Sequence, residues 1–120
     1  MSAPEYQEQR NVFEIAEKLK GKYPEIALLF HIPNGGRRDA AEAANLKRQG
    51  VKPGVPDLFL PVARGGYHGL FIEMKRRDGG RLSEYQKHWL HLLEREGYCA
   101  VVCHGAREAI DLIIGYLKEG

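Results

Sequence analysis

Two short apolar segments separated by a glycine-rich turn constrain the fold of this chain more than any other feature. The segments are residues 57–62 and 69–74, and the turn between them reads ARGGYH. Short apolar runs on either side of a turn that contains glycine are typical of a β-hairpin. The sequence therefore predicts two antiparallel strands, which must bury an apolar face against other elements.

The remaining elements are predicted from hydrophobic periodicity and from the residues that begin and end helices. Val12 and Leu19 belong to a stripe at helical spacing, and Ser83 followed by Gln86 forms the pattern of a capping box. Helices are predicted at residues 4–20, 37–50, 83–97 and 106–117, and further strands at residues 26–32 and 98–103. The last strand is apolar on both faces, as expected between two layers. The predicted order is αβαββαβα, an α/β fold with a mixed sheet flanked by helices.

Length and composition indicate a single domain over residues 1–120. A chain of 120 residues with 43% hydrophobic content can bury one core and is too short for two. Its apolar runs are far shorter than the roughly 20 residues needed to span a bilayer, and no signal-peptide pattern opens the chain. We therefore expect no membrane partner, a cytoplasmic location, and reduced thiols at Cys99 and Cys103.

Charged residues stand at one end of the predicted hairpin. Side chains alternate along a strand, so Glu73 and Lys75 share a face with Phe71. If the turn is centred near Gly65, antiparallel pairing puts Asp57 opposite Glu73. Opposed carboxylates repel and require a cation, for which Mg²⁺ or Mn²⁺ is the simplest candidate. The alternative is structural, with Asp57 at a strand end and a solvated pair of Glu73 and Lys75.

Five short motifs extend this pattern over nearly the whole chain. They are HIPNGG, GVPDLFLP, YHGLFIEMK, the Ser-Glu-Tyr-Gln opening of the third helix, and the Gly-Tyr before the final strand. In this order they resemble the VRR-NUC branch of the PD-(D/E)XK, or restriction-endonuclease-like, nuclease superfamily. The closest resemblance is to its small stand-alone members from phages and bacteria.

The resemblance implies a role for each residue at the end of the hairpin. Asp57, Glu73 and the backbone carbonyl of Met74 would hold Mg²⁺, with Mn²⁺ able to substitute. Lys75 and Gln86 would position the attacking water. Gln86 has an alternative role as the partner of a serine in the capping box.

The superfamily usually adds a glutamate from the first helix to the site. Glu8 lies four residues before Val12 and therefore directly above the apolar stripe, so we predict Glu8 as the catalytic and metal-binding residue. Glu5 is the other candidate, one turn nearer the helix end. Acidic residues in a first turn are also favoured by the helix dipole alone.

Basic residues gather on both sides of the predicted site along the sequence. A charge run is usually a solvated face, but this placement suits a groove that follows a phosphate backbone. Two polar residues at the HIPNGG loop either touch the substrate or simply end a strand and begin a turn. The predicted DNA-binding residues are His31, Asn34, Arg37, Arg38, Lys47, Arg48, Lys52, Arg76, Arg77 and Arg81.

These expectations describe a Mg²⁺-dependent DNA endonuclease in the cytoplasm of a bacterial or phage-infected cell. The resemblance implies branched DNA as the partner, with a four-way (Holliday) junction resolved by a homodimer. A nuclease for flaps or other branched DNA is the alternative within enzymes. A DNA-binding module without catalysis is the alternative outside them.

Overall fold

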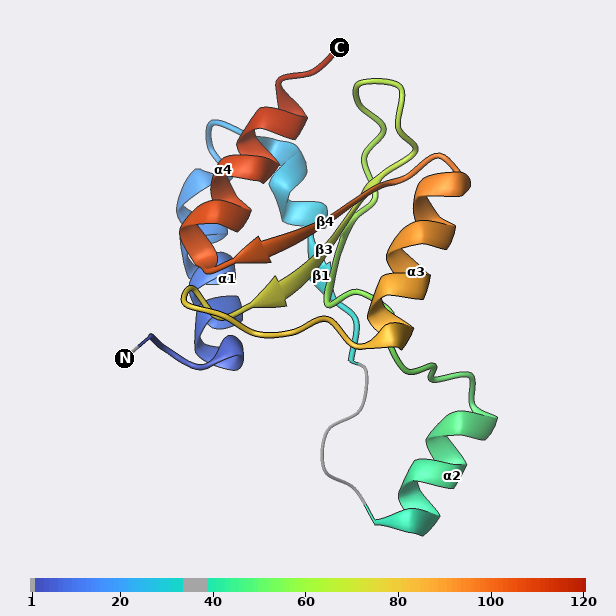
Figure 1. Cartoon of the computed structure of the whole chain (residues 1–120). Helices are drawn as coiled ribbons and strands as arrows, with labels where there is room; N and C mark the ends of the chain where they lie inside the picture. Colours follow the sequence, from blue (N-terminus) through green and yellow to red (C-terminus); the bar gives the residue numbers. More distant parts are fainter. Residues whose placement is uncertain (1, 34–38) are drawn as a thin grey trace.

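The structure, a computed structural model, describes residues 2–33 and 39–120. Its elements, drawn in Figure 1, are α1 (Glu5–Leu19), the 3₁₀ helix η1 (Pro24–Leu28), β1 (Phe30–His31), α2 (Ala40–Arg48), β2 (Leu58–Leu60), β3 (Leu70–Lys75), α3 (Glu84–Arg95), β4 (Cys99–His104) and α4 (Ala106–Leu117). The α-helices and strands follow the predicted order αβαββαβα, with the 3₁₀ helix as an addition. The predicted α/β fold class is confirmed.

The described strands form one mixed sheet in the order β1-β2-β3-β4. β1 pairs with β2, and β2 with β3, in antiparallel fashion, whereas β4 runs parallel to β3. Leu58 pairs with Ile72, and the same register continued by one residue places Asp57 opposite Glu73, as predicted. The turn between β2 and β3 contains Gly65 with φ 57°, a left-handed conformation that glycine adopts readily.

Helices cover both faces of the sheet (Figure 1). On one face, Leu70, Ile72 and Met74 of β3 join a core with side chains of α1 and α4. On the other face, the alternate residues of β3 lie beneath α3, which contacts Glu73 through a hydrogen bond. β4 lies between these helix layers, as predicted, but at an edge of the sheet.

The predicted strand at residues 26–32 is wrong over its first half. Pro24–Leu28 forms a 3₁₀ helix, and only Phe30–His31 pairs as a strand. Ile26 and Leu29 are both buried. Their spacing of three residues is one turn of a 3₁₀ helix, whereas a strand would bury alternate residues. The apolar content of residues 26–32 predicted a strand although apolar and polar residues do not alternate there, and the prediction failed for this reason.

α2 projects away from the sheet and its other helices (Figure 1). The Asp39 side chain caps its N-terminus by accepting a hydrogen bond from the backbone N–H of Glu42, and none of its residues is buried. Across the described part of the chain, every helix is too short or too polar to cross a bilayer.

Candidate active site

Asp57 is held in place just before β2 by contacts on both its backbone and its side chain. Pro56, which precedes it, is fully buried. The Asp57 carbonyl accepts a hydrogen bond from the Ile32 N–H at 2.7 Å and lies 2.8 Å from Nδ1 of His31. Its Oδ2 accepts a hydrogen bond from the Met74 N–H at 2.8 Å. The carboxylate is therefore fixed at the end of the hairpin.

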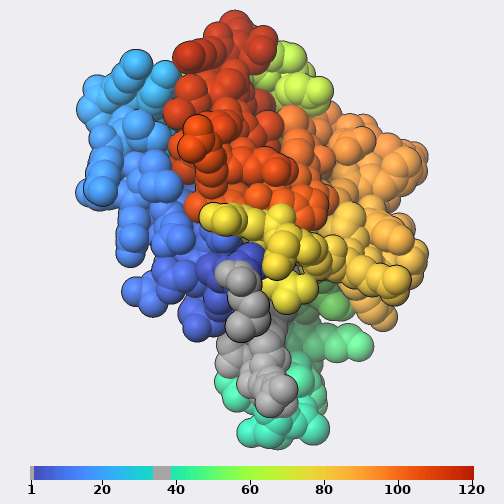
Figure 2. Space-filling model, turned by 60° about the vertical axis from the view of Figure 1, so that its left-hand side comes forward, coloured from blue at the N-terminus to red at the C-terminus, as the bar shows by residue number. Residues whose placement is uncertain are grey.

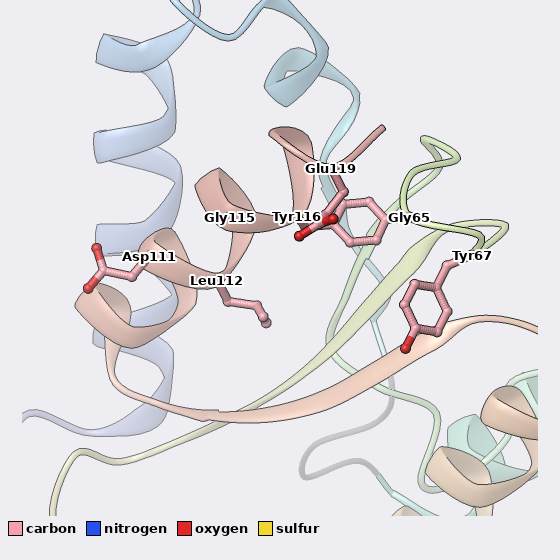
Figure 3. A pocket seen from close by; sticks show the side chains of 7 residues that line it. All are labelled: Gly65, Tyr67, Asp111, Leu112, Gly115, Tyr116 and Glu119. Atoms are coloured by element: carbon pink, nitrogen blue, oxygen red, sulfur yellow. The ribbon is translucent and has the colours of Figure 1, made fainter.

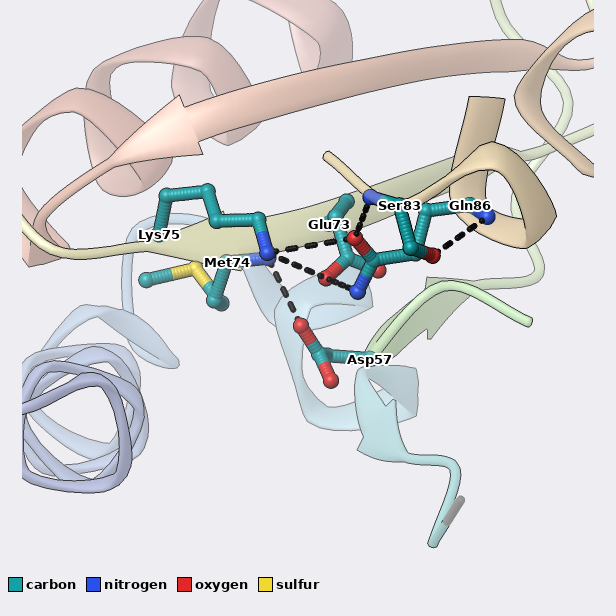
Figure 4. Close-up of polar contacts among 6 residues, drawn as sticks. All are labelled: Asp57, Glu73, Met74, Lys75, Ser83 and Gln86. Carbon is teal, nitrogen blue, oxygen red and sulfur yellow. Dashed lines mark hydrogen bonds and ion pairs between the residues drawn. The ribbon is translucent and has the colours of Figure 1, made fainter. Parts of the chain in front are cut away.

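Glu73, Lys75 and Gln86 meet beside it (Figure 4). The Gln86 Nε2 donates to Glu73 Oε2 at 2.9 Å, and Lys75 Nζ donates to Gln86 Oε1 at 3.2 Å. Lys75 Nζ lies 3.8 Å from Glu73 Oε2. The side chains of Glu73 and Lys75 are only 3% and 7% exposed, so they are not a solvated pair at a strand end.

The N-terminus of α3 positions Gln86. Ser83 caps this helix: its Oγ accepts a hydrogen bond from the Gln86 N–H, and its own N–H donates to Gln86 Oε1 at 2.8 Å. The predicted capping box is therefore present. Gln86 serves the cap and contacts Glu73 and Lys75 at the same time, so its two predicted roles are compatible.

Burial and repulsion perturb the acidity of Glu73. The pKa of Glu73 is raised from 4.5 to about 8, with burial as the largest cause and the charge and hydrogen bonding of Asp57 next. Lys75 opposes this effect, and the charge of Glu5 adds to it. Two carboxyl groups in contact with incomplete compensation by Lys75 form a site that favours an additional cation.

The backbone of β3 offers a third oxygen on the same side. The Met74 N–H points toward Asp57. Within a strand, the N–H and C=O of one residue point to the same edge, so the Met74 carbonyl also faces the edge where pairing with β2 has ended. The Lys75 carbonyl points the other way and accepts a hydrogen bond from Gly105 at 3.0 Å.

These oxygens fit a hard divalent cation. Two carboxylates and one carbonyl leave several positions of an octahedral shell for water and phosphate, which is the arrangement that Mg²⁺ prefers. Within residues 2–33 and 39–120, no group of three or more His, Cys, Asp or Glu side chains is placed to hold a metal ion.

The structure places Glu8 differently from the prediction. Glu8 is 4% exposed, and its Oε1 accepts a hydrogen bond from the Ala106 N–H at the start of α4. Its Oε2 lies 3.9 Å from Nε of Arg77. Glu8 continues the buried stripe of Val12, and this is why it points into the helix layer. Glu5 is exposed one turn earlier and is the α1 carboxylate whose charge acts on Glu73.

Seven of the ten predicted DNA-binding residues lie in the described part of the chain, where they fall into three groups. His31 lies at the site through its contact with Asp57. Arg76, Arg77 and Arg81 are exposed in the segment after β3, which lies beside the start of α1 (yellow and dark blue in Figure 2), where Ser2 donates a hydrogen bond to Asp78. Lys47, Arg48 and Lys52 are exposed on α2 and just after it, and Asn34, Arg37 and Arg38 lie outside the described residues.

Sequence reasoning missed the supports of the site more than its acids. The fully buried Pro56 and the backbone N–H of Ile32 fix Asp57. Neither is a reactive or charged group, so a search of the sequence for catalytic side chains does not select them. The GVPD motif contains Pro56, and this is the signal that could have indicated its role. Glu5 was recognised only as an alternative, since spacing alone places both acids on one side of α1.

A cavity of about 560 Å³ lies at the opposite end of β3, between the β2–β3 turn and α4 (Figure 3). Its walls include Gly65, Tyr67 and Tyr116. The acids at the C-terminal end of β3 are not among the residues that line it. This cavity is therefore separate from the site of Asp57 and Glu73.

The sheet, its helix layers and the Asp-Glu-Lys cluster at the end of β3 define a restriction-endonuclease-like fold. Comparisons with known proteins agree. The VRR-NUC domain family matches residues 3–107. A solved structure described as a VRR-NUC domain protein is 38% identical, with a TM-score of 0.86 over 100% of this chain and 93% of that one. No curated protein matches the chain. The chain belongs to the VRR-NUC family, a nuclease domain family.

Proposed function

We propose that this protein is a Mg²⁺-dependent DNA endonuclease, with Mn²⁺ able to replace Mg²⁺. The observation that carries the proposal is the contact of Asp57 with the buried carboxyl group of Glu73: burial first, and then the charge and hydrogen bonding of Asp57, raise the pKa of Glu73 to about 8 and so leave a site in need of a cation. Membership of a nuclease domain family supports the same chemistry. Asp57, Glu73 and the Met74 carbonyl would hold the ion. When bound, Mg²⁺ lowers the pKa of water and offsets charge on the phosphate.

The side chains of the chain itself orient the reaction. Lys75 Nζ lies 3.2 Å from Gln86 Oε1 and is held beside Glu73, where it can direct a water and stabilise negative charge on the phosphate. Gln86 keeps Glu73 in one orientation through its Nε2. We propose Glu5, rather than Glu8, as the α1 carboxylate of the site, because its charge acts on Glu73.

Asp57→Asn and Glu73→Gln test the assignment. Each should abolish cleavage of DNA in Mg²⁺ while DNA binding and the fold persist, because each removes one of two repelling carboxylates. Glu84→Gln is the matched control, since it removes the same charge from a side chain that is 91% exposed on α3. Cleavage by either site variant at the wild-type rate would disprove the assignment, and full activity in excess EDTA would disprove the metal requirement.

The preferred substrate is proposed to be a four-way junction, cut by a homodimer. This rests on the resemblance to small stand-alone members of the family and on the symmetry of the junction. A panel of four-way junctions, flaps and linear duplexes with Mg²⁺ compares the alternatives directly. Cutting of flaps alone would favour the second nuclease function, and binding without cutting of any DNA would favour a non-catalytic module.

A further inference from the structure

A cavity of about 350 Å³ opens next to the candidate active site. Ile32, Val51 and Val55 give it apolar walls, and Trp89 of α3 forms a flat aromatic side. Lys52 adds a positive charge. The volume is at the lower end of the range for small-molecule sites, about 300–1,000 Å³, and suits one ring system rather than a larger ligand.

Three elements that carry the candidate active site continue directly into the walls of this cavity. Ile32 donates its N–H to the Asp57 carbonyl at 2.7 Å. Val55 is separated from Asp57 by one buried proline. Trp89 follows Gln86 by three residues on α3, about one turn of the helix. A group in the cavity would therefore adjoin a phosphate bound at the metal ion that Asp57 and Glu73 would hold.

Close backbone packing fixes the cavity's shape. Gly54 has φ +91°, and a Cβ at this position would lie 2.5 Å from the carbonyl carbon of Tyr85. Only glycine lets the loop before Asp57 approach the first turn of α3 so closely. This contact holds the loop that carries Val55 against the helix that carries Trp89.

We propose that the cavity binds one unpaired nucleobase of the DNA strand being cut, stacked on Trp89. The proposal rests on the proposed nuclease function and specifies its substrate as DNA with a base outside the duplex stack. Aromatic side chains stack on any base, because every base has a π-face. A branch point, whether in a junction or a flap, supplies such a base next to a phosphodiester.

Charge favours a nucleic acid as the occupant over a peptide or a neutral ligand. Lys52 lines the cavity, and Lys47 and Arg48 are exposed in the last turn of the helix that precedes it. These cations suit a phosphate backbone that enters from this side. An apolar wall beside cations matches a nucleotide, which joins an apolar ring to an anionic phosphate.

Trp89→Ala in the full chain tests the proposal in single-turnover cleavage of a branched DNA. Loss of one stacked base predicts a rate about tenfold lower or more at subsaturating enzyme, and Trp89→Phe should retain most of the rate. Tyr67→Ala is the matched control: it removes an exposed aromatic side chain from the separate cavity at the other end of β3. Thermal unfolding of each variant shows whether it is folded.

Abasic nucleotides identify the base itself. Replacing nucleotides one at a time near the cut should reveal one position at which the wild type slows as much as Trp89→Ala. On DNA with the abasic nucleotide at that position, Trp89→Ala should cut no more slowly than the wild type does, because the abasic change and the substitution remove the same contact. 2-Aminopurine placed there should lose fluorescence on binding to Glu73→Gln, and this signal reports stacking without cleavage.

Two results would overturn the proposal. One is a folded Trp89→Ala protein that cuts branched DNA at the wild-type rate. The other is a wild type that cuts duplex DNA as well as branched DNA and tolerates every abasic position. In both cases the wild type still cuts in Mg²⁺, so the proposed nuclease function stands. A wild type that cuts no DNA would instead overturn the proposed function, and the base site with it.

Discussion

Glu73 is buried beside a second carboxyl group, which makes its protonation sensitive to folding and to metal. Burial and the neighbouring Asp57 raise its pKa from 4.5 to about 8, against the opposing charge of Lys75. A hard cation between the two carboxyl groups would displace the proton and replace repulsion with attraction. Metal binding at this site is therefore expected to strengthen as the pH rises toward 8.

The first prediction concerns pH and stability without metal. Between pH 4.5 and about 8 the folded protein retains a proton on Glu73 that the unfolded chain has released, so unfolding releases a proton. The free energy of unfolding should consequently fall as the pH rises through this window, by up to about 1.4 kcal/mol per pH unit. Urea titrations in EDTA measure it.

Glu73→Gln should remove this part of the pH dependence, whereas Glu84→Gln should leave it unchanged. Saturating Mg²⁺ should flatten the slope for the wild type, because the ion binds the deprotonated folded form. An identical slope for the wild type and Glu73→Gln would show that Glu73 titrates normally.

The second prediction concerns Glu8, which joins α1 to the start of α4. Glu8→Ala removes the acceptor of the Ala106 N–H and should lower the free energy of unfolding by about 2 kcal/mol. Glu8→Gln keeps an oxygen acceptor and should cost less. Urea titration gives both values.

DNA cleavage assays of the Glu8 and Glu5 variants distinguish the structural role of Glu8 from a catalytic role. Glu8→Gln should cut DNA within a few-fold of the wild-type rate under conditions where it is folded, whereas Glu5→Gln should lose most activity with unchanged stability. Loss of cleavage in folded Glu8→Gln, with activity retained in Glu5→Gln, would reverse the assignment.

At the scale of elements, the segment between β3 and α3 presents arginines beside the site. Arg76, Arg77 and Arg81 are all exposed there, and Arg77 Nε also lies 3.9 Å from Oε2 of Glu8. The third prediction is that Arg76→Ala and Arg81→Ala each weaken DNA binding and reduce the log–log salt slope by about 0.9. Titration of fluorescent DNA with inactive Glu73→Gln protein at several salt concentrations measures the slope.

Arg95→Ala is the control for this experiment. Arg95 is exposed in the last turn of α3, at the opposite end of the helix from Gln86. Its loss should leave the slope unchanged. If the salt slope of DNA binding is the same for all three variants, Arg76 and Arg81 make no phosphate contact and belong to an ordinary solvated surface.

The fourth prediction concerns the loop that delivers Asp57 to the site. Gly54→Ala places a Cβ at φ +91° and 2.5 Å from the backbone of Tyr85, so it should lower the free energy of unfolding by about 2 kcal/mol or more. Gly115→Ala, in α4 with open space around the new Cβ, should raise it by about 0.5–1 kcal/mol. Thermal and urea unfolding compare the two, and equal effects would show that the contact with Tyr85 is not constraining.

Local signals predicted most elements, because the residues that set them are close in sequence. The capping pair of Ser83 and Gln86 located α3, and the hairpin turn set the register that faces Asp57 with Glu73. The 3₁₀ helix at Pro24–Leu28 was missed, since Ile26 and Leu29 are buried in the core, where their helix packs against α1, rather than by strand pairing. The contact between Glu8 and the Ala106 N–H could not be predicted locally either, because the two residues are 98 positions apart.

At the scale of the whole molecule, the sheet brings residues from four segments to one end. Asp57 precedes β2, Glu73 and Lys75 end β3, and Gln86 lies in the first turn of α3, while Glu5, whose charge acts on Glu73, lies in the first turn of α1. Alternation along a strand could predict the pair on β3. It could not predict that α1 enters at this end, because that depends on how α1 packs against α4.

The last prediction concerns assembly. Each chain contributes one pair of Asp57 and Glu73, whereas resolving a four-way junction requires two symmetric cuts. A two-fold homodimer places one site on each of two opposing strands. Light scattering should therefore give the mass of two chains, and a cruciform plasmid should be linearised by paired cuts within one binding event.

Mixed dimers test whether the two sites cut independently within one complex. Differently tagged wild-type and Glu73→Gln chains, purified as heterodimers, should nick the cruciform without linearising it, because only one site retains both carboxylates. Wild-type homodimers carrying the same tags serve as the control and should linearise it. A wild type that is monomeric by light scattering and releases only nicked plasmid would contradict the dimer and would favour a substrate that needs one cut, such as a flap.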